Sequence, residues 1–132
     1  MAADPLPLGL VKRAFPVPVY RDSQIIASQT NARVGSIVLD RRARIPRIDF
    51  SLEVQGSSGT VTAVTARVGG TAISEAVNPA TGAGTKTGSL RPLSSLKDFA
   101  PGTVVEVVAT TAANSTIDSA ALNFSVDGIN NM

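Results

Sequence analysis

The stretch TVVEVVATTAANSTIDSAALNFSV, residues 103–126, decides the fold. Its first half places Val105, Val107 and Ala109 on one face of an extended chain, because successive strand side chains point to opposite faces. Its second half repeats the alternation, with an apolar residue at every second position from Ala120 to Val126. The polar turn ANST separates the two runs, so we expect a closing antiparallel hairpin.

The same alternation appears further upstream. In IDFSLEVQ (48–55) every second residue is apolar, which predicts a half-buried strand. The turn GSSG follows, and TVTAVTARV (60–68) is expected to return as a second strand, with Val64, Ala66 and Val68 facing the core. The Gly69-Gly70 pair then predicts a two-residue hairpin into TAISEAV (71–77).

The segment between these strand regions is harder to place. NPATGAGTKTG (78–88) has nothing to bury and predicts a long exposed loop. SLRPLSSL (89–96) is expected to be an edge strand, because Pro92 cannot donate to a central ladder. One helical turn is expected at most, over Ser94–Phe99. The chain is therefore expected to be all-β, with six or seven short strands packed as a two-sheet sandwich.

A family resemblance rests on LKDFAPGTVVEVVATTAANSTIDSAALNFSV (96–126). This segment resembles the end of immunoglobulin-like and fibronectin-III-like modules of bacterial surface proteins and phage virions. In those modules a leucine and a PGT turn precede the penultimate strand, and an NS-type turn precedes the last. The resemblance implies an immunoglobulin-like antiparallel β-sandwich over residues 46–127, followed by a tail, 128–132.

The first third of the chain differs in charge and proline content. Residues 1–47 carry eight Lys or Arg against three acids, a net charge of +5, whereas residues 48–132 carry four against seven, a net charge of −3. Such a step is typical of an arm joined to a folded body. We expect residues 1–45 to be an extended, proline-rich, basic arm, of which SQIIASQ (23–29) or RVGSIVLD (33–40) adds a strand.

The front of this arm, LGLVKRAFPVPVY (8–20), combines apolar side chains with Pro16 and Pro18, which exclude a helix interior and a central strand. Ordering each residue costs about 1–2 kcal/mol, and this segment has no helix or hairpin of its own to offset that cost. It must therefore dock on a surface, either of the chain's own sandwich or of a neighbouring molecule, and we expect the neighbouring molecule. The residues expected to make this contact are Leu8, Leu10, Val11, Phe15, Pro16, Val17, Pro18, Val19 and Tyr20.

The basic stretch DRRARIPR (40–47) is the main electrostatic feature. Its Arg41, Arg42, Arg44 and Arg47 are suited to neutralising either phosphates or acidic protein groups. Because the rest of the chain is acidic, pairing with protein carboxylates is favoured over nucleic acid.

The chain offers little for catalysis. It contains no cysteine and no histidine, which removes the usual nucleophile–base pairs and the commonest metal ligand. Asp49 and Glu53 share one strand face about 13 Å apart, further than paired glycosidase carboxylates. GAGTKTG (82–88) lacks the spacing of a phosphate-binding loop. We therefore expect no catalytic residue, cofactor, metal or small-molecule substrate.

Together these features predict a non-enzymatic structural protein of a virus (phage) particle, made in the host cytoplasm and located in the virion. It would be a capsid decoration or cement protein, or another virion component, whose arm docks on like subunits or on a major capsid or tail protein. No apolar run approaches the roughly 20 residues of a membrane helix, and the N-terminus lacks the order of a signal peptide. Two alternatives remain: a bacterial surface adhesion or carbohydrate-binding module, and a coat protein with a basic arm facing nucleic acid.

Overall fold

The computed structural model describes residues 12–57, 59–79, 82–92 and 98–129. In this part of the chain the secondary structure is strand, without a helix. The strands are β1 (Lys12–Arg21), β2 (Ala32–Val38), β3 (Ala43–Gln55), β4 (Val61–Val68), β5 (Thr71–Ala72), β6 (Gly84–Leu90), β7 (Val104–Thr111) and β8 (Thr116–Ile129).

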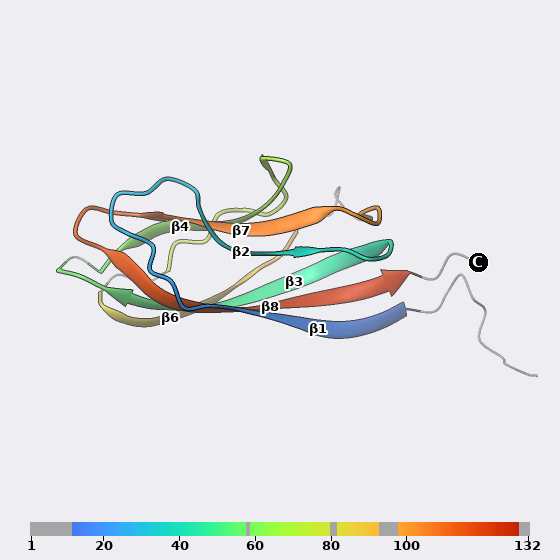
Figure 1. The fold of residues 1–132 in the computed structure, drawn as a ribbon, viewed down its shortest axis with the longest axis horizontal. Helices are drawn as coiled ribbons and strands as arrows, with labels where there is room; N and C mark the ends of the chain where they lie inside the picture. Colours follow the sequence, from blue (N-terminus) through green and yellow to red (C-terminus); the bar gives the residue numbers. More distant parts are fainter. Residues whose placement is uncertain (1–11, 58, 80–81, 93–97, 130–132) are drawn as a thin grey trace, which may run out of the picture.

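The strands form two antiparallel sheets that lie one over the other (Figure 1). The first sheet has the order β1-β8-β3-β6, and the second has the order β2-β7-β4-β5. The expected all-β sandwich is therefore confirmed.

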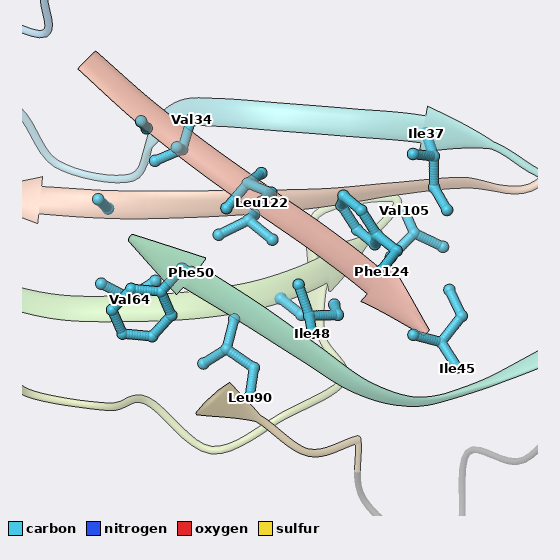
Figure 2. Close-up of a cluster of buried hydrophobic side chains, with 14 of the residues drawn as sticks. Val34, Ile37, Ile45, Ile48, Phe50, Val64, Leu90, Val105, Leu122 and Phe124 are labelled. Atoms are coloured by element: carbon cyan, nitrogen blue, oxygen red, sulfur yellow. The ribbon is translucent and has the colours of Figure 1, made fainter. Parts of the chain in front are cut away.

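The core lies between the sheets and follows the predicted alternation. Ile48, Phe50, Leu52 and Val54 of β3 are buried, as are the apolar residues at every second position of β8 from Ala120 to Val126. Figure 2 shows side chains of both sheets meeting there, among them Val34, Ile37, Ile45, Val64, Leu90, Val105, Leu122 and Phe124. Every buried side-chain nitrogen or oxygen atom in the described residues has a hydrogen-bond partner, so these polar atoms do not carry the cost of an unmade hydrogen bond.

The expected closing hairpin is wrong. β7 and β8 lie in opposite sheets, so the ANST turn crosses from one sheet to the other. Asn114 has a positive φ of 57°, and the buried Ser115 hydroxyl accepts a hydrogen bond from the Thr60 amide at 2.8 Å. β3 and β4 likewise belong to different sheets. Alternation identifies the buried face of a strand, but not the strand beside it.

The Gly69-Gly70 hairpin is confirmed. Val68 pairs with Thr71 across the two glycines, whose φ angles of 58° and 82° are those of a type I′ turn. β5, the strand that follows, is only two residues long.

The expected loop over residues 78–88 is wrong at its end. Gly84–Leu90 forms β6, which pairs with β3 from Val54 to Ile48. β6 occupies the edge of the first sheet, as expected for residues 89 and 90, while residues 93–97, with most of the expected helical turn, lie outside the described residues. The sequence of β6, GTKTGSL, shows no apolar alternation. At the inward position opposite Phe50, for example, β6 has Gly88 in place of an apolar side chain.

The expected separate arm is also corrected. β1 pairs with β8 of the same chain, from Lys12 opposite Ile129 to Arg21 opposite Ala120. β2 and the first residues of β3 lie in the sandwich as well, so residues 12–45 are part of the folded body. The expected strand over 33–40 is largely β2, whereas in 23–29 only Ile25 makes a bridge, to Ile117. Residues 1–11 lie outside the described residues.

Candidate docking surface

β1 forms one edge of the first sheet, and its two faces differ. Val17 and Val19 point inward, are half-buried and pack against the core. Pro16, Pro18 and Tyr20 point outward and are exposed, with Tyr20 at 75%. Six of the expected contact residues, Phe15 to Tyr20, thus lie on a strand of the chain's own sheet. Leu8, Leu10 and Val11, together with the side chain of Phe15, lie outside the described residues.

The two prolines fit this strand because they are two residues apart. The N–H and C=O of a strand residue point to one side, and those of the next residue point to the other. Pro16 and Pro18 therefore direct their nitrogens to the same side, and as prolines cannot donate, that side is the free edge. The two prolines are incompatible with a central strand, as expected from the sequence, but an edge strand tolerates both of them.

The outer face beside β1 is hollowed. The register places Tyr20 beside Ala121 of β8 and Ser51 of β3, so two small side chains lie next to one large one. In the adjacent row Pro18 is followed by Asn123 and Asp49. The resulting hollow has a volume of about 330 Å³. A second hollow of about 200 Å³ lies on the other side of Tyr20, towards Arg21, Ser119 and Glu53.

We call the two hollows on either side of Tyr20 the groove. Its rim consists of polar side chains that are held in place by hydrogen bonds. Asp49 accepts a hydrogen bond from the Ser89 hydroxyl and pairs with Arg47 at 3.2 Å. Glu53 accepts a hydrogen bond from the Thr85 hydroxyl at 2.8 Å. These carboxylates are held by β6, so they border the groove at set positions. The groove therefore combines an apolar wall on β1 with a polar wall on β3.

The four arginines of the basic stretch are paired within the chain. Arg42 Nη2 and Arg44 Nε each lie 2.9 Å from a different carboxylate oxygen of Asp98. A backbone bridge between Ala43 and Phe99 brings Asp98 to this position. The hydrogen bonds from Arg44, and then Arg42, lower the pKa of Asp98 below its ordinary value, although partial desolvation opposes the shift.

The other two arginines use nearer partners. Arg41 Nε lies 3.2 Å from Asp40, and this hydrogen bond lowers the pKa of Asp40. Arg47 pairs with Asp49 at the groove. The acids Asp49 and Asp98 belong to the part of the chain with net charge −3, so some of the expected pairing between the two parts occurs inside one molecule.

Metal-ligating side chains are not clustered in the described residues. No set of three His, Cys, Asp or Glu side chains could hold a metal ion there. Nor do these residues include a helix of the length and apolarity that crossing a membrane requires.

Sequence reasoning missed the β3 and β8 side of the groove. The signal would have been the small outward residues Ser51 and Ala121, but their proximity follows from the β3–β8 pairing, which the alternation within each strand does not give. Comparison with protein families and with curated proteins finds no match for this chain.

Proposed function

We propose that this protein is a non-enzymatic structural component of a virus (phage) particle, a capsid decoration or cement protein or another virion component. In this proposal it attaches to like subunits through the outer face of the first sheet, at Pro16, Pro18 and Tyr20. The observation that carries the proposal is the exposure of Tyr20 beside a groove with small residues at its floor.

The chemistry of this surface suits a protein partner. Tyrosine offers a large contact area with few rotatable bonds, and proline rings are already rigid, so little conformational entropy is lost on contact. The groove floor at Ala121 and Ser51 can receive a side chain from the partner. The fixed carboxylates Asp49 and Glu53 supply a polar rim, as protein interfaces commonly have.

Light scattering of two matched variants tests the proposal. Tyr20→Ser removes the exposed ring, whereas Val38→Ser removes a side chain that is 65% exposed on β2 of the second sheet. The parent protein and Val38→Ser should form oligomers of the same mass, and Tyr20→Ser should be monomeric. A parent protein that stays monomeric, or oligomers that tolerate Tyr20→Ser, would contradict docking between like subunits at this surface.

The groove also favours a second candidate, carbohydrate binding. An exposed aromatic ring beside Asp49, Ser51 and Asn123 offers an apolar face with hydrogen-bonding groups at its edge. Tyr20 is the only tyrosine and the chain has no tryptophan, so intrinsic fluorescence reports on this groove alone. A saturable fluorescence change on adding glycans, lost in Asn123→Ala, would favour this candidate over assembly.

A further inference from the structure

We propose that β1 is an exchangeable strand, which leaves its own β8 and pairs in the same register with β8 of a second copy of the chain. The inference rests on the proposed assembly function and deepens it, because it names the partner, the strand that moves and the surface that receives it.

β1 pairs with β8 along its whole length but contributes little to the core between the sheets. From Pro16 to Arg21 its side chains are exposed or half-buried, and only Val17 and Val19 pack against the core. The neighbouring strand β8 instead supplies Leu122 and Phe124 to the centre of the sandwich. This part of β1 therefore covers the core without forming its centre, so its release leaves the central packing in place.

The chain has a hinge and an anchor directly after β1. Asp22, Ser23 and Gln24 are exposed and lie between strands. Ile25 is buried and exchanges two backbone hydrogen bonds with Ile117, of 2.7 and 3.0 Å. Rotation within these three exposed residues would swing β1 outward while Ile25 keeps the rest of the chain in place.

The side-chain hydrogen bonds of Arg21 and Gln24 at the hinge are exposed. Arg21 donates to the carbonyl oxygens of Ser23 and Arg33, at 2.9 and 2.8 Å. Gln24 donates to Asp118 of β8 at 2.8 Å. Hydrogen bonds at exposed positions exchange readily with water, so they contribute little against release.

The receiving surface is the one that β1 leaves. It consists of the edge of β8 and of Gly35 in β2, where an added Cβ would lie 3.0 Å from Val19 Cγ1. A second copy offers the same edge and the same space for Val19, so the interactions that β1 makes within one chain re-form between two chains. The segment from Lys12 to the anchor at Ile25 is long enough to extend about 40 Å.

The prolines define where the exchanged sheet ends. Pro16 and Pro18 remove two donors from the outer side of β1, so a further strand cannot pair there continuously. Their rings also keep the released strand extended, which reduces the entropy lost when it pairs again. Exchange thus replaces β1 of each sheet with β1 of the second copy, and the prolines keep a further strand from pairing on its outer side.

Single-cysteine variants test this exchange, because the chain contains no cysteine of its own. Pro16 and Ser125 lie directly opposite each other on the outer face. Such facing residues have a Cα separation of about 4.5–5.5 Å, within the range that a disulfide bridges. Pro16→Cys and Ser125→Cys, prepared as separate proteins with different tags, are incubated together and oxidised. Val38→Cys replaces Ser125→Cys in the control mixture.

Exchange predicts a disulfide-linked heterodimer of Pro16→Cys with Ser125→Cys, and none with Val38→Cys. If neither mixture gives the heterodimer, and the double variant Pro16→Cys/Ser125→Cys closes its disulfide within single chains, the exchange is overturned. Light scattering of the same closed double variant separates the two proposals. Oligomers that persist with β1 locked in place leave the proposed function standing, whereas the absence of oligomers in the parent protein removes both.

Discussion

The ring of Phe50 covers Gly88, the residue directly opposite it on β6: a Cβ added to Gly88 would lie 2.5 Å from Phe50 Cζ. This contact closes the core at the edge of the first sheet, where β6 brings only one fully buried side chain, Leu90. The glycine is therefore required by packing, although its backbone conformation is an ordinary one.

Gly88→Ala is expected to destabilise the fold by about 1–3 kcal/mol, because a buried aromatic ring must shift to admit the methyl group. Urea unfolding followed by circular dichroism measures the change. Thr87→Ala, on the exposed face of the same strand, is the matched control and should cost less. Equal stability of Gly88→Ala and the parent protein would show that Phe50 does not occupy this position.

Replacing both Pro16 and Pro18 with threonine is expected to promote aggregation. The substitution restores two N–H donors on the free edge of β1, and a continuous unpaired edge is a template for strand addition. Thioflavin fluorescence and turbidity over time measure the effect. Pro46→Thr is the control, because Pro46 lies at an irregularity in the β3–β8 pairing. A double variant as resistant to aggregation as Pro46→Thr would contradict the protective role of the edge prolines.

Asp98→Asn is expected to reduce the loss of stability in acid. The arginine hydrogen bonds lower the folded-state pKa of Asp98 below its ordinary value of 3.8, so the folded state binds fewer protons than the unfolded state. The resulting stability is present above the unfolded-state pKa and is lost as the pH falls through the folded-state pKa.

Thermal melts from pH 6 down to pH 3 measure this difference. The parent protein should lose more melting temperature than Asp98→Asn over the acid end of this range. Asp22→Asn, which alters an exposed carboxylate on the connection after β1, should follow the parent. Parallel curves for the parent and Asp98→Asn would show that the pairs with Arg42 and Arg44 add no stability.

Nucleic-acid binding is expected to be weak. Arg41, Arg42, Arg44 and Arg47 already pair with carboxylates of the same chain, so phosphates must compete with them. Fluorescence anisotropy with a labelled oligonucleotide should give a Kd no tighter than about 10⁻⁶ M at physiological salt, the range of non-specific binding. A tighter, strongly salt-dependent Kd would instead support the coat-protein alternative.

The features that could be predicted from the sequence are those that follow from apolar alternation within a strand and from turn residues. The buried faces of β3 and β8 and the Gly69-Gly70 hairpin follow from local patterns, and all three are confirmed. Strand partners do not follow from such patterns, since a buried face can be covered by either sheet. That is why ANST was expected to join paired strands, although it crosses between the sheets.

Two further differences between prediction and structure arise at sheet edges. Pro16 and Pro18 are incompatible with a central ladder, and GTKTG has no apolar residues to mark a strand. An edge strand needs backbone partners on one side only, so β1 tolerates prolines on its free side. β6 is likewise an edge strand, and it pairs with β3 although only Leu90 of its side chains is fully buried. The groove was missed because it depends on both the β1–β8 and the β3–β8 register.

The most direct test of assembly through β1 is the accessibility of Tyr20 to a soluble quencher as the protein concentration rises. Tyr20 is the only tyrosine, and tryptophan is absent, so its emission reports this position alone. If like subunits dock here, quenching by iodide should be strong in the dilute monomer and fall as light scattering registers oligomers. Tyr20 that stays fully quenchable in the oligomer would contradict docking between like subunits at this face.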